Sequence, residues 1–149
     1  MGIQSSREYM GNITFNKTQL QNMMKAQRIT YDSGLVSLSS NRMITALSPL
    51  STVLGLLFVT STPAGIAAGV AGIYTGLLSN TRETLKSLVM TGYWEMDYYE
   101  DLFNKYPQYT SIEAKVRFIE YVVDGKTIRW ITGKGYPLRI KTSNGWITM

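Results

Sequence analysis

The sequence predicts an α+β fold, with N-terminal helices around a hydrophobic, Gly-rich helical hairpin and a C-terminal four-stranded antiparallel β-meander. Three observations support this fold class. Residues 43–81 contain no Lys, Arg, Asp or Glu, helix-capping patterns occur on both sides of that segment, and the hydrophobic period changes from helical to strand-like in the last third. We therefore divide the chain into a polar N-terminus with an amphipathic helix (1–42), the hairpin (43–81), two amphipathic helices (82–107) and the meander (113–149).

The composition excludes several kinds of chemistry. The 149 residues are enough for one ordinary domain, and they include no Cys and no His. Disulfides, thiol nucleophiles, most zinc sites and Ser-His-Asp triads are therefore excluded, and we expect neither a cofactor nor an enzyme. The net charge of +5 favours an anionic partner such as a lipid surface. Its distribution is too diffuse for us to expect specific nucleic-acid binding.

The N-terminal part contains one clear helix signal. After a polar start, Asn16 and Gln19 form a capping-box pattern, and an apolar stripe follows that ends near Gly34. The stripe faces a protein core or, as the alternative, a membrane surface. The Ser-rich residues 35–48 are predicted to be a linker or a short strand.

Two prolines lie within the uncharged segment. Ser48 precedes Pro49 and Thr62 precedes Pro63, which predicts helix starts at about 49 and 63. A helix over 49–59 would be roughly 17 Å long, and one over 63–78 roughly 24 Å, both shorter than a hydrocarbon core of about 30 Å. A helical hairpin, or one long helix kinked at Pro63, fits these lengths better than a single membrane span.

The second arm of the hairpin carries four glycines, Gly65, Gly69, Gly72 and Gly76, on one helical face. A glycine inside a helix costs about 1 kcal/mol relative to alanine, so four of them indicate close approach of another backbone. The pattern resembles small-xxx-small membrane interfaces and the glycine zippers of some pore-forming toxins. The alternative is a Gly-rich helix packed tightly at the centre of a soluble domain.

The segment after the hairpin is predicted to be helical. Asn80 and Glu83 form a second capping-box pattern, with a helix end at Gly92. A second, aromatic-rich helix ends at Pro107. Carboxylates one turn apart on that helix have no other catalytic residue type near them, so we do not assign an acid/base site. Arg42, Arg82 and Trp94 are the predicted interface anchors of the hairpin.

The C-terminal third contains the clearest signal. Asp124-Gly125 predicts a two-residue hairpin turn. The residues on its two sides are then expected to pair in order, from Val123 with Lys126 to Phe118 with Ile131. Further turns are predicted at 133–135 and 144–145. Basic residues, together with Trp130 and Trp146, leave single-stranded nucleic acid or sugar binding as a weaker alternative to a structural role.

Two functions follow from these patterns. The first is a non-enzymatic, membrane-active protein, pore-forming or toxin-like, that acts on an anionic lipid bilayer as a homo-oligomer and is secreted or membrane-associated. The second is a structural or assembly protein, such as a phage particle component, with the hairpin buried between subunits. In both, the key positions are the four glycines and the apolar residues of the first arm, Leu54, Leu56, Leu57, Phe58 and Val59.

Overall fold

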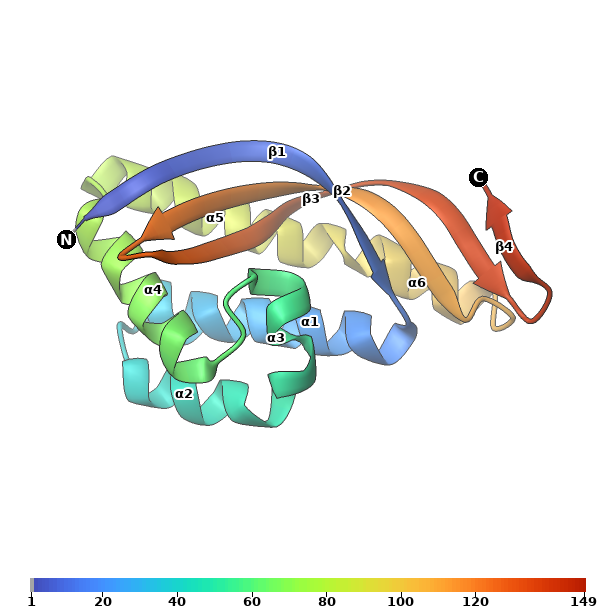
Figure 1. Cartoon of the computed structure of the whole chain (residues 1–149), viewed down its shortest axis with the longest axis horizontal. Coiled ribbons are helices and arrows are strands. Elements are labelled where there is room, and N and C mark those ends of the chain that lie inside the picture. Colours follow the sequence, from blue (N-terminus) through green and yellow to red (C-terminus); the bar gives the residue numbers. More distant parts are fainter. Residues whose placement is uncertain (1) are drawn as a thin grey trace.

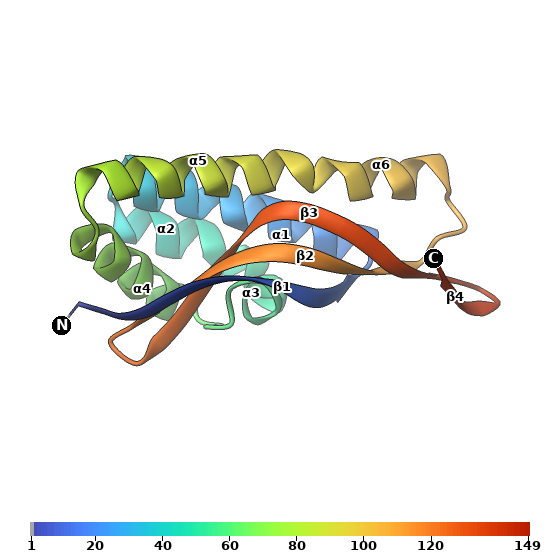
Figure 2. The ribbon, with the colours of Figure 1, turned by 90° about the horizontal axis from the view of Figure 1, so that it is seen from above.

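The structure is a computed structural model that describes residues 2–149, in which helices pack against a long, curved antiparallel sheet (Figures 1 and 2). In chain order the elements are β1 (Ile3–Phe15), α1 (Lys17–Ile29), η1 (Thr30–Val36), α2 (Ser40–Leu47), η2 (Ser48–Leu50), α3 (Ser51–Phe58), α4 (Pro63–Gly76), α5 (Ser79–Glu95), α6 (Asp97–Lys105), β2 (Ser111–Val123), β3 (Lys126–Thr142) and β4 (Gly145–Thr148). The α+β class and the four-stranded antiparallel sheet are confirmed.

One strand of the sheet comes from the N-terminus. The strand order is β1-β2-β3-β4, and β1 pairs with β2 from Ile3–Val123 to Phe15–Ile112. Our expectation of a polar N-terminus before the first helix is wrong for these residues. The even-numbered positions of β1 face solvent and, apart from Met10, are polar, whereas Ile13 and Phe15 are buried.

The β2–β3 hairpin forms as predicted. Its register runs from Val123–Lys126 to Phe118–Ile131, and Asp124 and Gly125 have φ values of 50° and 77°. Positive φ at both positions is what a type I′ turn requires. The turn chemistry therefore fixes the register of β2 against β3 next to the turn.

The predicted turn at 133–135 is wrong, because β3 runs without interruption from Lys126 to Thr142. Its register against β2 shifts near this point, and Gly135 has a φ of 58°. A Cβ on Gly135 would lie 1.7 Å from the carbonyl oxygen of Lys115, so the glycine allows a bulge rather than a reversal. The chain reverses at Ser143 and Asn144, close to the predicted third turn.

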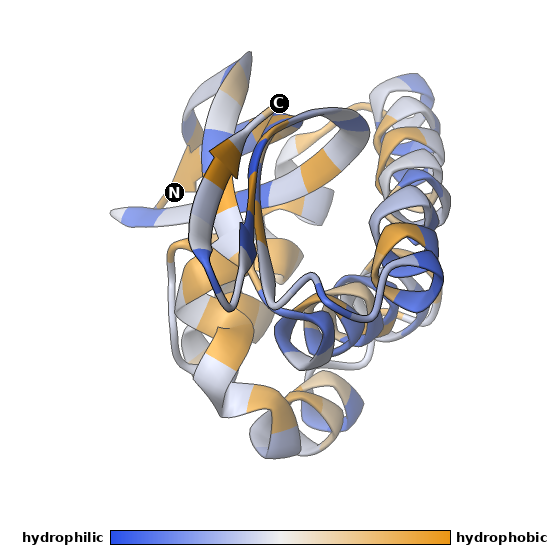
Figure 3. Ribbon diagram, turned by 90° about the vertical axis from the view of Figure 1, so that its right-hand side faces the viewer, coloured by the Kyte–Doolittle hydropathy of each residue, from blue (hydrophilic) through white to orange (hydrophobic). Residues whose placement is uncertain are grey.

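The buried face of β2 changes side along the strand. Alternate residues up to Phe118 are buried, and then the opposite set, beginning with Ile119, is buried instead. Strong twist brings one face of the sheet against the helices at one end and the other face at the other end. Figure 3, a view along the long axis, shows the resulting curl of the strands beside the helices.

The helices agree with their start signals in part. Asn16 and Gln19 form the predicted capping box, with bonds of 2.7 and 2.9 Å. Thr62 caps α4, which begins at Pro63. The prediction of a linker or strand over 35–48 is wrong: α2 lies there, because Ser39 caps it and Met43 and Leu47 face the core.

Helix α5 differs from its prediction at both ends. It begins at Ser79, and the Asn80 side chain accepts a hydrogen bond from the Thr81 N–H instead of forming a capping box with Glu83. Gly92 lies inside the helix rather than at its end. A Cβ there would lie 1.7 Å from the carbonyl oxygen of Ile131, so this glycine permits close contact between α5 and β3.

Candidate binding surface

The first arm of the predicted hairpin lies in the core. Leu54, Leu57 and Phe58 are fully buried, Leu56 is partly buried, and Val59 is exposed with a φ of 78°. Within residues 2–149, no helix combines the length and the hydropathy that crossing a bilayer requires. The apolar side chains of this segment therefore have protein neighbours in the folded chain.

Three of the four glycines pack on the sheet. A Cβ on Gly69 would lie 2.6 Å from a side-chain carbon of Ile128, and one on Gly72 would lie 2.8 Å from a side-chain carbon of Val123. Gly76 lies against Ile3, whereas Gly65 lies beside its own capping residue Thr62. The close approach indicated by the glycine spacing is thus made to the chain's own strands.

The three predicted anchors are spread over two helices. Arg42 is exposed on α2 and Trp94 on α5. Arg82 stacks on the ring of Tyr74 at 4.3 Å, and its Nε donates to the Tyr74 carbonyl oxygen. Arg82 therefore joins the start of α5 to α4.

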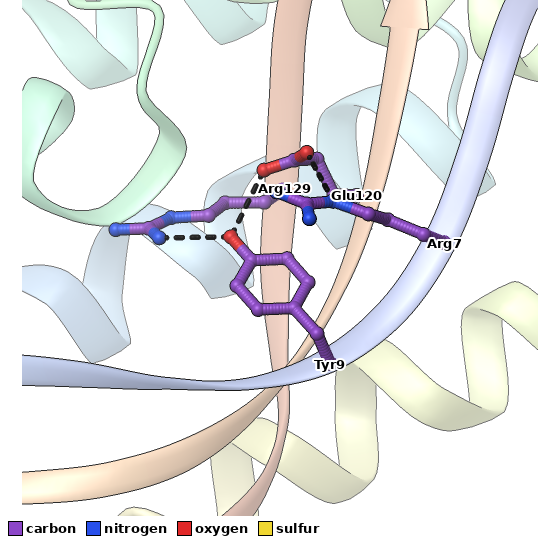
Figure 4. Close-up of polar contacts among 4 residues, drawn as sticks. All are labelled: Arg7, Tyr9, Glu120 and Arg129. Carbon is purple, nitrogen blue, oxygen red and sulfur yellow. Dashed lines mark hydrogen bonds and ion pairs between the residues drawn. The ribbon is translucent and has the colours of Figure 1, made fainter.

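A polar cluster of Arg7, Tyr9, Glu120 and Arg129 links three strands (Figure 4). Glu120 accepts hydrogen bonds from Arg7 Nε and from the Tyr9 hydroxyl, both at 2.9 Å, and Arg129 donates to the same hydroxyl at 3.1 Å. The bond and the charge of Glu120 raise the pKa of Arg7. Both carboxylate oxygens are engaged inside the chain, which is the arrangement of a structural clamp.

Arg129 also bonds the end of α3. Its guanidinium donates to the carbonyl oxygens of Leu56 and Leu57 at 3.0 and 2.9 Å, and it stacks on the Phe118 ring at 4.0 Å. A cation at a helix C-terminus satisfies carbonyls that have no intrahelical partner. The cluster therefore holds α3 to the sheet.

The outer edge of β3 is covered along most of its length. Thr60 bonds the Thr127 carbonyl, and the Gln27 side chain bonds both the N–H and the carbonyl of Ile131. Glu95 accepts from the Lys134 N–H, and the Tyr99 hydroxyl donates to the Lys134 carbonyl. Burial raises the pKa of Tyr99, which keeps this donor protonated.

The outer edge of β1 has no such cover. Within residues 2–149, the backbone of this 13-residue strand bonds only to β2. We call it the free edge. Unpaired strand edges are the usual place where a further strand is added to a sheet.

One face of the sheet is open at the end where β4 lies. We call it the open face. Its residues alternate with buried ones such as Ile13, Ile112 and Ile140, which lie on the side of α1 and α6. The residues of the open face are Met10, Asn12, Thr14, Ser111, Glu113, Lys115, Arg117, Tyr136, Arg139, Lys141, Trp146 and Thr148.

The open face is basic and carries two exposed aromatics. It holds four cations and one carboxylate, a local charge of +3, and only Arg139 has an ion-pair partner within residues 2–149, Glu113 at 2.7 Å. Tyr136 is 51% exposed and Trp146 is 37% exposed, with Arg139 stacked 4.2 Å from the Trp146 ring. The unpaired cations are Lys115, Arg117 and Lys141.

A groove borders the open face where α5 approaches the sheet. It has a volume of about 380 Å³, and Arg117, Met10 and Gly133 line it on the sheet side. Glu95 lines the other side, but its carboxylate already accepts from the Lys134 N–H. Arg117 is therefore the ionic group of the groove that remains available to a ligand.

The β3–β4 hairpin extends the open face past the helices (Figure 1). Ile147 and Met149 are exposed there, and the end of β4 is apolar in Figure 3. Trp130, which the binding alternative would need at the surface, is fully buried, and its indole N–H donates to the Thr30 hydroxyl. The sequence indicated the basic strands, but only the pairing of β1 with β2 shows which cations share a face.

Comparison of the chain with known protein families, characterised proteins and solved structures gives no match. The described residues contain no group of three or more Asp and Glu side chains placed to hold a metal ion.

Proposed function

We propose that this is a non-enzymatic, membrane-active protein that contacts anionic bilayers through its open face and its β3–β4 hairpin. The observation that carries the proposal is the set of three unpaired cations beside exposed Tyr136 and Trp146 on one surface. Aromatic rings favour the headgroup region of a bilayer, and cations favour anionic lipids.

The expected attraction is large enough to hold the protein on a membrane. Each Lys or Arg close to an anionic surface contributes about 1 kcal/mol, so Lys115, Arg117 and Lys141 together contribute on the order of 3 kcal/mol. Exposed apolar side chains at the tip, Ile147 and Met149, add burial in the interface. Because the charges are at the surface, binding should weaken as salt rises.

Vesicle co-sedimentation tests the proposal. The wild type should bind vesicles that contain phosphatidylserine, and it should bind pure phosphatidylcholine weakly. The double variant Lys115→Glu, Arg117→Glu should lose about tenfold or more in affinity. A matched double variant on the far side of α1, Lys17→Glu, Lys25→Glu, changes the net charge equally and should retain most binding. Equal losses in both variants, or binding to a single-stranded oligonucleotide but not to vesicles, would contradict the proposal.

We further propose that bilayer contact releases α3 and α4, so that their apolar side chains insert and the glycine faces associate. The chain itself offers a direct test, because it has no cysteine. A Cβ on Gly72 would lie 4.0 Å from the Val123 Cβ, within the usual range for a disulfide. The variant Gly72→Cys, Val123→Cys should therefore lock α4 to the sheet when oxidised.

Dye release reports on this second step separately from binding. The oxidised lock should bind vesicles as the wild type does but release no dye, and reduction should restore leakage. Full leakage from the oxidised lock would show that α4 does not leave the sheet. The variant Gly69→Leu is also expected to abolish membrane activity. It is a less specific test than the disulfide lock, because the leucine side chain would clash with Ile128 in the folded protein.

The second candidate function is that of an assembly protein, and the free edge of β1 favours it. A second copy could extend the sheet by pairing along this edge. Light scattering with chromatography would then give a homo-oligomer in plain buffer, and the outer amides of β1 would be protected from hydrogen exchange. A monomer with fast exchange along β1 would contradict assembly through this edge.

A further inference from the structure

A cavity lies between η1, α2 and α4, far along the chain from the strands of the open face. Its volume is about 200 Å³. Its walls are mainly apolar, and hydroxyl groups occur among its lining residues. The lining residues are Gly34, Leu38, Ser39, Ser40, Met43, Ala71, Tyr74 and Thr75.

The size and lining select a narrow apolar ligand. Pockets that hold drug-sized molecules usually measure about 300–1,000 Å³, so this cavity has room for a single hydrocarbon chain but is too small for a multi-ring ligand. Met43 and Tyr74 are the largest apolar side chains of the lining besides Leu38, and Met side chains adapt to a flexible chain. No ionisable carboxylate lines the cavity.

One cation stands beside the cavity wall. The guanidinium of Arg82 lies 4.3 Å from the centre of the Tyr74 ring, and Arg82 makes no ion pair within residues 2–149. Its Nε donates to the Tyr74 carbonyl, while its two Nη groups have no protein acceptor among the described residues. Arg82 can therefore offer a bidentate contact to a carboxylate.

A strained residue forms part of the wall. Leu38 has a φ of 53° and is 55% exposed, although leucine disfavours this backbone region. Strained residues with exposed apolar side chains occur often at ligand sites. A hydrocarbon chain in the cavity would remove the Leu38 side chain from water.

We propose that this cavity binds the acyl chain of a free fatty acid, with the carboxylate at Arg82. The site is separate from the open face, and the inference holds whether or not the protein binds bilayers.

The experiment uses the full chain without vesicles, with sodium dodecanoate below its micellar concentration as the probe. Methyl-¹³C labelling of methionine gives one NMR signal from Met43, which lines the cavity. Dodecanoate should shift the Met43 signal in a saturable way. No shift, or shifts confined to other methionines, would overturn the proposal.

Two pairs of variants locate the ligand. Ala71→Phe fills the cavity from an exposed helix position and should abolish the Met43 shift, while Ala68→Phe, one turn earlier on α4 and outside the cavity, should preserve it. Arg82→Gln should weaken dodecanoate binding roughly three- to fivefold, the gain expected of an exposed ion pair, and Lys17→Gln should not. Dodecanol should bind the wild type and Arg82→Gln equally.

Each outcome decides one part of the inference. Unchanged binding in Ala71→Phe, or equal loss in Ala68→Phe, would overturn the site. Unchanged dodecanoate binding in Arg82→Gln would overturn the assignment of the carboxylate to Arg82. Vesicle binding is measured with the same variants and should be unaffected, so failure here is distinguishable from failure of the membrane proposal.

Discussion

The sheet has two outer edges, on β3 and β1, which differ in how their backbone groups are satisfied. Side chains and backbone from the helices and their loops form hydrogen bonds to β3 at Thr127, Ile131 and Lys134. Strand β4 pairs with the last part of β3, residues 139–142. The edge of β1 receives no such bonds from residues 2–149. The hydrogen bonds from the helices and their loops thus reach the sheet through β3, which leaves the outer backbone edge of β1 available to a partner.

The difference also explains two unusual buried residues. Gln27 is a polar side chain in the core, and Gly92 is a glycine inside a long helix. Both lie against Ile131. Their conformational and desolvation costs are offset because they close the β3 edge, and altering them should therefore separate the helices from the sheet.

The largest effect is expected from Gly92→Ala. The new methyl group would meet the backbone of Ile131 at less than van der Waals distance, so α5 would have to move away from β3. We expect a loss of about 3 kcal/mol or more in the free energy of unfolding, measured by urea titration. Ser87→Ala, exposed on the same helix, should change stability by less than about 0.5 kcal/mol. Similar values for both variants would show that α5 does not depend on close contact with β3.

Gln27→Leu should come next, with a loss of about 2–4 kcal/mol, because it leaves the Ile131 N–H and carbonyl buried without partners and removes a second bond to the Val89 carbonyl inside α5. Hydrogen exchange should show faster exchange at the Ile131 amide. The matched change on the exposed side of α1, Gln21→Leu, removes only a surface bond to Glu100 and should be close to neutral. An unchanged Ile131 exchange rate in Gln27→Leu would mean that this amide is protected by something other than Gln27.

The third prediction concerns alkaline pH. The pKa of Tyr99 is raised in the folded protein, mainly by burial, whereas in the unfolded chain it should be about 10. The contribution of Tyr99 to the free energy of unfolding is therefore complete below about pH 10 and decreases as the pH rises further. At pH 11 the free energy of unfolding should be lower by about 1 kcal/mol. Urea unfolding at pH 8, 10 and 11 should show a shallower decline in Tyr99→Phe. Part of the decline should remain, because burial also raises the pKa of Tyr121.

The smallest effect should come from Val59→Gly. Val59 contacts the β3 edge with φ 78° and ψ −60°, the geometry of a strained γ-turn. Relief of this strain should stabilise the protein by up to about 1 kcal/mol, or raise Tm by roughly 2–4 °C. Val36→Gly, at an exposed helical position without positive φ, should destabilise instead. A loss in Val59→Gly would show that the valine side chain contributes more than its backbone costs.

Local signals predicted the local elements well. Asp124-Gly125 specified a hairpin with its register, and Asn16 with Gln19 specified a helix start, because both depend on residues next to one another in the chain. The strand at the N-terminus was not predicted, since its pairing with β2 depends on residues more than 90 positions away. Gly92 was assigned to a helix end because the sequence does not show which backbone approaches it.

The candidate surfaces were predictable only in part. The basic strands and Trp146 were recognised from the sequence. Which of the basic residues lie on the same face as Trp146 depends on the pairing of β1 with β2 and on the register shifts between β2 and β3. The apolar segment 43–81 was recognised as the feature that organises the chain, and the structure places its helices α3 and α4 against the sheet. Its glycine spacing indicated close packing, although spacing alone does not identify the packing partner.

The pairing of Ile3 with Val123 also affects when the sheet can form during protein synthesis. A ribosome adds about 5–20 residues per second, so the N-terminal strand must wait roughly 6–24 s between its own synthesis and that of its partner. During that interval β1 lacks its partner strand, β2. Strands β1 and β2 can pair only after the helices between them in the sequence have been synthesised. Synthesis of the last third of the chain is therefore required before the sheet can form.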